Sequence, residues 1–193
     1  AGLPVIEHQV CRHESELPAG GDVVMKLCSA DVPHKSDHGL VALSPPDPAA
    51  EFRRQRERCV ALGARFEGVI VAKRARGGRE LALGARIDPA FGPVVLVGDG
   101  GIYLEALKDF RLLLPPFTEE DVLRKLGELR IAPLLGAVRG QPPRDVKAFA
   151  RMAVRLGEAM TQWDGAVVSV DINPVMVFET GAIALDALII FAP

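Results

Sequence analysis

The chain has 193 residues, of which 49% are hydrophobic and 25% are charged, and its formal net charge is −2. This length can bury a full core in one domain or two small ones, no apolar stretch approaches the roughly 20 residues of a membrane span, and the charge argues against nucleic acid as the main partner. The three cysteines lack CxxC spacing and cannot all pair, which fits a reducing compartment, so we expect a cytoplasmic location and no membrane partner.

The first half of the chain predicts strands and one helix. Apolar runs bounded by turn residues predict the strands at 22–27, 40–43, 68–72 and 80–86, and a stretch that ends at Gly63 predicts the helix at 49–62. Because Arg76-Gly77-Gly78-Arg79 has strong turn character, we expect the last two strands to form a hairpin. The basic run 53–58 is interleaved with glutamates at helical spacing, which favours a solvated helix face over a nucleic-acid site.

The second half continues with a buried strand, two helices and a terminal ribbon. The strand at 93–97 runs into the glycine-rich turn Gly98-Asp99-Gly100-Gly101. One helix is expected from Thr118, with a capping box, and another follows Pro142-Pro143 with an apolar stripe from Val146 to Met160 that we interpret as core. Mixed strands and helices with several hairpins indicate an α+β (mixed α/β) fold with partly antiparallel sheets.

The terminal ribbon brings oxygen-bearing side chains together. Strand alternation points Asp171 and Asn173 the same way, and a turn at 179–182 predicts a hairpin in which the numbers of paired residues sum to 361. This register sets Asp186 opposite Val175 and diagonal to Asn173, at roughly 7 Å. Mg²⁺ accepts carboxylate and amide oxygens, so a metal site is one interpretation. A half-exposed hairpin whose polar residues face water is the other.

Four further features are candidates for chemistry. Lys26 interrupts an apolar strand and needs an anion such as a phosphate, unless it is a snorkelling lysine of an edge strand. The loop at 34–39 contains two histidines, a lysine and an aspartate, and is either reactive or merely polar. The turn with Gly100 and Gly101 could bring backbone N–H groups to a phosphate, and Glu80 could orient a ribose or a lysine, or face solvent. Walker-type GxxxxGK[ST] spacing is missing from the sequence, as is any supported Ser/His/Asp or Cys/His arrangement.

Segments spread along nearly the whole chain match one family pattern in order. The most specific is Asp88-Pro89-Ala90-Phe91-Gly92-Pro93-Val94-Val95 with its Gly100-Gly101-Ile102 continuation. The others are 23–26, 29–37, 67–71, 79–81, 107–109, 135–140, 171–174 and 185–187. Together they resemble the ATP-grasp module of the ADP-forming acyl-CoA synthetases, relatives of the succinyl-CoA synthetase β subunit.

The resemblance implies an ATP-grasp fold in which two α+β subdomains, 1–72 and 73–193, clasp the nucleotide, with the first trimmed at its start. It implies Mg²⁺ and ATP or ADP as cofactors. His34 matches the histidine that carries the phosphoryl group as phosphohistidine. The residues that it assigns to the metal are Asn173, Asp186 and, in support, Asp171. The residues that it assigns to ATP are Lys26 at the phosphates, Val71 and Lys73 on the strand along the adenine, Glu80 nearby, and Gly100 and Gly101.

The implied reaction is reversible and converts a carboxylic acid, CoA and ATP into acyl-CoA, ADP and phosphate, through phosphohistidine and an acyl phosphate. The sequence contains no CoA-binding Rossmann domain and no second ligase domain, so we expect these as partner domains or as a subunit, in an oligomer. Leu40 stands where the family has a second glycine, which keeps open a catalytically degenerate, nucleotide-binding regulatory module, as in acetyltransferase-fused relatives. A free-standing carboxylate ligase is a third alternative. Retention of Lys26, His34, Asn173 and Asp186 favours the synthetase.

Overall fold

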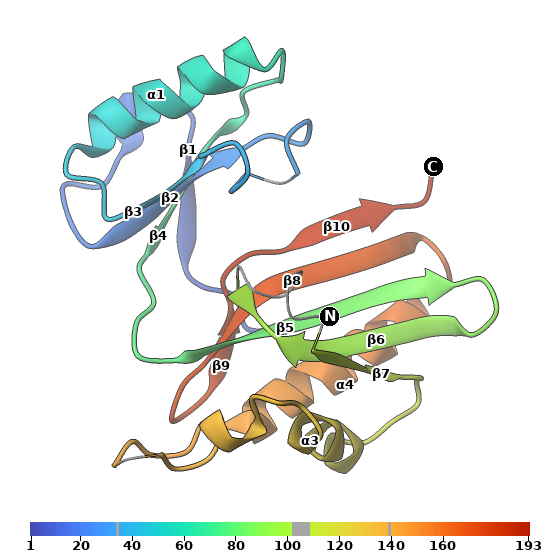
Figure 1. The fold of residues 1–193 in the computed structure, drawn as a ribbon. Coiled ribbons are helices and arrows are strands. Elements are labelled where there is room, and N and C mark those ends of the chain that lie inside the picture. The colour runs from blue at the N-terminus through green and yellow to red at the C-terminus, as the bar shows by residue number, and fades with distance from the viewer. Residues whose placement is uncertain (34, 102–108, 139) are drawn as a thin grey trace. The chain divides into compact units, whose positions relative to one another are not determined.

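The computed structural model describes residues 1–33, 35–101, 109–138 and 140–193 (Figure 1). The chain divides into two compact units: Ile6–Arg76 forms one, and Ala1–Val5 together with Gly77–Pro193 forms the other. Both units combine strands with helices, which confirms the mixed α and β class expected from the sequence. Within the described ranges, no helix is both long and apolar enough to span a membrane.

The unit Ile6–Arg76 is a four-stranded antiparallel sheet with one α-helix against it, and its strands lie in the order β1-β4-β2-β3. Its elements are β1 (His8–Cys11), a short 3₁₀ turn (Glu14–Glu16), β2 (Val23–Cys28), β3 (Val41–Leu43), α1 (Pro48–Ala61) and β4 (Gly68–Lys73). Alternation along β2 buries Met25 and Leu27 on the side of α1. Lys26 is half-buried on the opposite face of the same strand.

Helix α1 lies where the sequence predicts a helix. The Asp47 side chain accepts a hydrogen bond from the Ala50 backbone N–H at the start, and Gly63 follows the end with a φ of 70°. Phe52 is buried against the sheet, whereas the arginines of the 53–58 run are all exposed. The interpretation of this run as a solvated helix face is therefore confirmed.

The second unit is built on a larger antiparallel sheet with strands in the order β10-β8-β5-β6-β7, and β9 also pairs with β8. Its strands are β5 (Arg79–Asp88), β6 (Gly92–Asp99), β7 (Phe110–Leu113), β8 (Val167–Val177), β9 (Ala182–Ala184) and β10 (Leu188–Phe191). Strand β8, which comes late in the chain, thus lies beside β5 inside the sheet, so residues about 90 positions apart become neighbours, as in the pair of Gly84 and Asp171.

Helices cover one face of this sheet. They are α3 (Glu119–Gly127), a short 3₁₀ turn (Ala132–Leu134) and α4 (Val146–Gln162). Helix α4 packs against β5, β6 and β8, while α3 packs against α4, β6 and β7 (Figure 1). Phe149 and Met160 of α4 are buried together with Leu81 and Leu83 of β5, which confirms that the apolar stripe is core. Thr118 begins α3 with the expected capping box.

The hairpin predicted at Arg76-Gly77-Gly78-Arg79 is wrong, because the strands on its two sides belong to different sheets. Strand β4 already has β1 and β2 as neighbours, and β5 lies between β6 and β8. Both strands therefore satisfy their backbone hydrogen bonds without each other. The glycine-rich segment instead joins the two compact units.

The terminal ribbon pairs in a different register from the one predicted. Val175 lies opposite Ala184 rather than Asp186, and all pairs of β8 with β9 and β10 except the last have numbers that sum to 359. The turn sets this register, because the Phe178 N–H donates to the carbonyl oxygen of Gly181 at 3.0 Å and closes a tight loop between them. The predicted turn was centred one residue too far along the chain.

Asp145 holds the ribbon turn in this position. Its carboxylate accepts hydrogen bonds from the backbone N–H groups of Gly181 (2.9 Å) and Ala148 (3.0 Å), so it fixes the turn and caps α4 at the same time. Its own N–H donates to the carbonyl oxygen of Phe178 at 2.8 Å. The hydrogen bonds from Gly181 and Ala148 favour the charged carboxylate and hold the pKa of Asp145 below its usual value.

We predict that Asp145→Ala destabilises the fold more than Asp47→Ala, which removes the cap of α1. Loss of that ordinary cap should lower the free energy of unfolding by about 1 kcal/mol. Asp145→Ala should lower it by about 2–3 kcal/mol, because a second charge-assisted hydrogen bond is lost. Urea denaturation at pH 7 measures both, and equal losses would contradict this role.

The stabilisation by Asp145 should also depend on pH. Because the folded-state pKa of Asp145 is lowered, its stabilisation is present above the unfolded pKa of about 3.9 and is lost as the pH falls through the folded value. The difference between wild type and Asp145→Ala should therefore shrink at acid pH.

Candidate functional site

The glycine turn after β6 packs closely on its neighbours. A Cβ atom at Gly100 would lie 2.5 Å from the carbonyl carbon of Leu81, and one at Gly98 would lie 2.8 Å from the carbonyl oxygen of Asp109. Gly101 has a φ of +77°, and a Cβ there would collide with the carboxylate of Glu80. The glycines are therefore required by close approach of the backbone to β5 and to Asp109.

Asn173 connects this turn to β8. Its side-chain oxygen Oδ1 accepts a hydrogen bond from the Gly101 N–H at 2.9 Å. Between Leu81 and Leu83 of β5, the pairing with β8 shifts by one residue, which is a β-bulge next to Asn173. A bulge re-aims the side chains around it. Val175 is consequently fully buried in the core, although strict alternation would put it on the same face as Asn173, which stays half-buried beside the turn.

The pairs that flank residues 185–187 point to a position for Asp186 nearer to Asn173 than predicted. Strands β9 and β10 pair with β8 in one register on both sides of residues 185–187, and continuing that register across the irregular residues 185–187 would set Asp186 opposite Asn173. Residues directly across an antiparallel pair have Cβ atoms about 5 Å apart, nearer than the diagonal distance expected. Asp171 is exposed and lies two residues before Asn173, on the face away from α4, because Val170 beside it is buried in the core.

The oxygen donors at this place suit a hard divalent cation. An amide oxygen has two lone pairs, so Asn173 can keep its bond from Gly101 and also bind a cation, and Asp186 and Asp171 add carboxylate oxygens. Within the ranges that the structure describes, no group of three or more His, Cys, Asp or Glu side chains is arranged to hold a metal. The predicted set has only two such side chains, so water or phosphate oxygens would complete the coordination. The metal site remains a prediction that the donor chemistry fits.

Both N–H groups of the glycine turn are engaged within the protein. The Gly100 N–H donates to the carboxylate of Asp99 (3.1 Å) and the carbonyl oxygen of Glu80 (3.3 Å), and the Gly101 N–H donates to Asn173. A phosphate could bind the N–H groups, as predicted, only by replacing one of these acceptors. What the geometry supports directly is that the turn fixes the positions of Asn173 and Glu80.

The remaining predicted nucleotide residues belong to the unit Ile6–Arg76. Lys26 lies on β2, which has β3 and β4 on its two sides, and this excludes the edge-strand alternative. Val71 is buried, and β4 pairs on both of its sides, with β1 and β2. Lys73 is exposed at the end of β4. The predicted catalytic residue His34 lies outside the described residues, as do 102–108 and Arg139 of the matching segments.

Sequence reasoning missed an ion pair behind the turn. The carboxylate of Asp99 is almost fully buried and lies 2.6 Å from the guanidinium of Arg79. Arg79 directly precedes Glu80, so the start of β5 contacts the turn through both side chains. The sequence did contain a signal for this ion pair: Asp99 directly follows an apolar strand, and a carboxylate buried there needs a charged partner.

The sequence is similar to one protein family over almost its entire length. The ATP-grasp domain family matches residues 1–191. The chain belongs to this family. The β subunit of acetate–CoA ligase (ADP-forming) I from Pyrococcus furiosus is 36% identical to this ATP-grasp chain, over 98% of the chain and 85% of the subunit. Acetate–CoA ligase (ADP-forming) I from Archaeoglobus fulgidus is 34% identical over 96% of the chain, but that match spans 29% of the ligase.

Solved structures have the same fold. One is the dinucleotide forming acetyl-coenzyme A synthetase 1 of Ca. Korarchaeum cryptofilum in complex with coenzyme A, Ca-AMPCP and HgCl+, with a TM-score of 0.90 and 30% identity over 99% of this ATP-grasp chain and 87% of that chain. The same synthetase with coenzyme A and Mg-AMPPCP has a TM-score of 0.77 and 30% identity over 99% and 86% of the two chains. In that complex a phosphohistidine segment points towards the nucleotide binding site. A relative therefore holds magnesium and a nucleotide analogue.

We predict that Gly100→Ala destabilises the fold by about 1–3 kcal/mol, because the new methyl group must displace the backbone of Leu81. Gly127→Ala is the matched control, since a Cβ there meets no described atom within 4 Å and lies at the end of α3. That control should be neutral or stabilising by up to about 1 kcal/mol. Thermal denaturation compares the two, and a Gly100→Ala variant as stable as the control would refute the close packing.

Proposed function

We propose that this chain is the ATP-grasp subunit, or an ATP-grasp domain, of an ADP-forming acyl-CoA synthetase. The observation that carries this proposal is the match with the P. furiosus β subunit over 98% of the chain and 85% of the subunit. The contacts of Gly101 with Asn173 and Glu80 support it, because they assemble predicted site residues from three separate strands and turns. We assign the two compact units to the ATP-grasp subdomains expected at 1–72 and 73–193.

The rest of the synthetase reaction needs partners. The chain corresponds to 29% of the A. fulgidus ligase, so the larger part of that enzyme has no counterpart here. We propose that CoA-binding and ligase domains, as a second subunit or as further parts of one protein, bring the carboxylic acid and CoA, and that the assembly is oligomeric. Cys11, Cys28 and Cys59 are all free, which supports the expected reducing, cytoplasmic location.

Lys26 and Lys73 are the residues of the unit Ile6–Arg76 that we assign to the nucleotide. Lys26 is half-buried opposite Val41 and Ile70, so an ATP phosphate would stabilise its charge. Lys73 is exposed at the strand end, which leaves its ammonium accessible to a ligand. Val71 has its side chain in the core and its backbone in two ladders, so its contribution is to hold β4 in place.

On the other unit, Asn173, Asp186 and Asp171 are the residues that would hold Mg²⁺, and Glu80 is the one that would face the ribose. When bound, Mg²⁺ would neutralise the negative charge that develops on the phosphates during phosphoryl transfer. The protein contributes position: the Gly101 N–H orients the amide of Asn173, and continuing the register of β8 with β9 and β10 would bring Asp186 beside it.

His34 is the residue that we assign to phosphoryl transfer, from its matching sequence context and from the phosphohistidine segment of the Korarchaeum synthetase. A neutral imidazole nitrogen attacks the γ-phosphorus while the bond to the bridging oxygen breaks and ADP leaves. A carboxylate oxygen of the acid then takes the phosphoryl group, which gives an acyl phosphate and restores the imidazole. The CoA thiolate finally displaces phosphate and forms the thioester.

Leu40 is the departure that keeps the regulatory alternative open. Its side chain is fully buried with Leu27 and Cys59 between the sheet and α1, so it does not extend into the loop at 35–39. The leucine side chain therefore does not occupy the surface of that loop. The relatives are synthetase subunits and domains, which favours the active enzyme over the regulatory module.

The metal assignment predicts that Asn173→Ala and Asp186→Ala each weaken Mg-AMPPCP binding at least about tenfold, because each removes one oxygen ligand. Isothermal calorimetry on the assembled enzyme measures this. Asp164→Asn is the control, since Asp164 is exposed and its φ of 45° is one that asparagine adopts. Without Mg²⁺, the wild-type enzyme and both alanine variants should bind AMPPCP equally weakly. If both alanine variants bind Mg-AMPPCP as tightly as wild type, the assignment of Asn173 and Asp186 to the metal is wrong.

The phosphohistidine assignment predicts acid-labile, base-stable label on His34 when the assembled synthetase is incubated with [γ-³²P]ATP. The expected pattern follows from the N–P bond, which acid cleaves and base preserves. His38→Ala is a matched control in the same segment and should label normally. Equal labelling of His34→Ala would refute the role, and wild-type nucleotide binding without any label would favour the regulatory module.

A further inference from the structure

Two buried carboxylates mark the ends of the sequence between β6 and β7. Asp99 ends β6 and Asp109 directly precedes β7, and each side chain is about 6% exposed. Their backbones are joined, because the Asp99 N–H donates to the carbonyl oxygen of Asp109 at 3.2 Å. Gly98 packs against that same carbonyl oxygen. The start and the end of this stretch are thus fixed to each other.

Each carboxylate has its own basic partner. Asp99 pairs with the guanidinium of Arg79 at 2.6 Å. Asp109 accepts a hydrogen bond from the Arg130 backbone N–H at 2.7 Å and has the guanidinium of Arg111 at 3.4 Å. A buried charge is tolerated only when it is paired and hydrogen-bonded. The two sets of partners come from different parts of the unit, so each carboxylate is held by contacts of its own, in addition to the bond that joins the two backbones.

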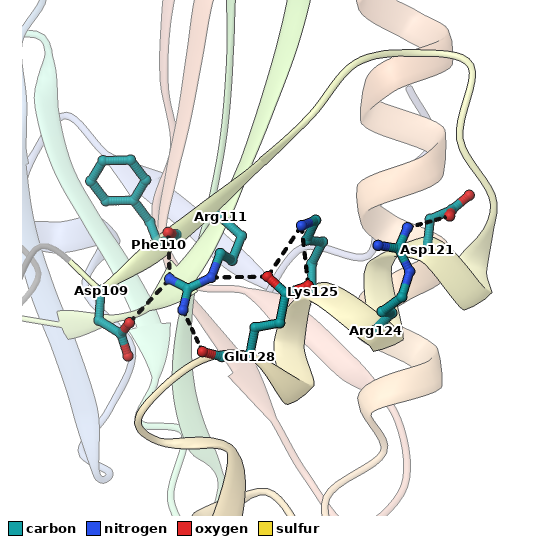
Figure 2. Close-up of polar contacts among 7 residues, drawn as sticks. All are labelled: Asp109, Phe110, Arg111, Asp121, Arg124, Lys125 and Glu128. Atoms are coloured by element: carbon teal, nitrogen blue, oxygen red, sulfur yellow. Dashed lines mark hydrogen bonds and ion pairs between the residues drawn. The ribbon is translucent and has the colours of Figure 1, made fainter.

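Arg111 connects Asp109 to helix α3. Figure 2 shows its guanidinium between Asp109, the carbonyl oxygen of Phe110 and Glu128. It donates to the Glu128 carboxylate at 3.2 Å and also to the Glu128 carbonyl oxygen, and Lys125 donates to the same carboxylate at 3.1 Å. Because Glu128 is the C-terminal cap of α3, this network fixes Asp109 to a helix of the core.

Asp99 connects these contacts to the glycine turn of the candidate site. Its Oδ1 atom accepts from the Gly100 N–H at 3.1 Å as well as from Arg79, so the carboxylate orients the peptide at the start of the turn. The next residue, Gly101, contacts Asn173 and Glu80. A chain of direct contacts therefore runs from the two aspartates to two residues of the proposed nucleotide site.

We infer that Asp99 and Asp109 are positioning residues of the nucleotide site, which act through the glycine turn on Asn173 and Glu80. This inference rests on the proposed function. Neither carboxylate needs to touch the ligand. A purely structural role in the core would lower stability in the same variants, but it would not single out the nucleotide among the substrates.

The test uses the assembled synthetase with Asp99→Asn, Asp109→Asn and the control Asp121→Asn, whose carboxylate belongs to the capping box of α3 and contacts none of the turn residues. The dissociation constant of Mg-AMPPCP and the KM values of ATP and CoA are measured together with the melting temperature. We expect the first two variants to weaken Mg-AMPPCP binding and raise the KM of ATP at least about tenfold. The KM of CoA should stay within about twofold, and the control should bind nucleotide normally.

Nucleotide affinity within twofold of wild type in both variants would overturn the inference, as would a parallel rise in the KM of CoA. If Asp99→Asn fails to fold, the double variant Arg79→Met/Asp99→Leu removes the buried carboxylate, its partly exposed partner and the acceptor for Gly100, and it should fold and show the same tenfold loss. Normal nucleotide affinity in that double variant would equally overturn it. If the unchanged enzyme does not bind Mg-AMPPCP at all, the proposed function fails, and this inference fails with it.

Discussion

The hydrogen bond from the Gly101 N–H to Oδ1 of Asn173 connects two segments that lie 72 residues apart in sequence. It forms because β8 returns to the middle of the sheet beside β5, and because glycines let the turn after β6 approach β5 closely. The bulge beside Asn173 completes the arrangement, since it buries Val175 and leaves the amide at the turn. The proposed nucleotide chemistry of this unit depends on that contact.

Local signals predicted the helices well. Helices α1 and α3 begin at capping residues, Asp47 and Thr118, and their sequences show which face is buried. Local signals could not show whether β4 and β5 pair as a hairpin, because turn residues do not reveal which sheet a strand joins. The edge strands β1, β7 and β10 were not predicted at all; each has only four residues and pairs on one side. Their pairing comes from the sheet and not from their own pattern.

The ribbon register failed for a long-range reason. A symmetric turn was the simplest assumption, but the turn is held by Asp145, which lies 36 residues before Gly181 and also caps α4. Among the site residues, the resemblance singled out Glu80, Gly101 and Asn173, and the structure brings these three together. Asp99 was not singled out, because its importance lies in a buried partner, Arg79, that no local spacing reveals.

We propose that side-chain oxygens of this fold, and no Walker loop, hold the metal at the nucleotide. The central claim is that Asn173 and Asp186 face one divalent cation at the nucleotide. A crystal structure of the assembled enzyme with Mn²⁺ and AMPPCP tests this most directly, because the anomalous signal locates the metal. The account predicts an anomalous peak within coordinating distance of both Oδ1 of Asn173 and a carboxylate oxygen of Asp186. For Mg²⁺, which Mn²⁺ replaces in this experiment, that distance is about 2.1 Å. A metal held only by phosphates or by other residues, with neither side chain as a ligand, would contradict it.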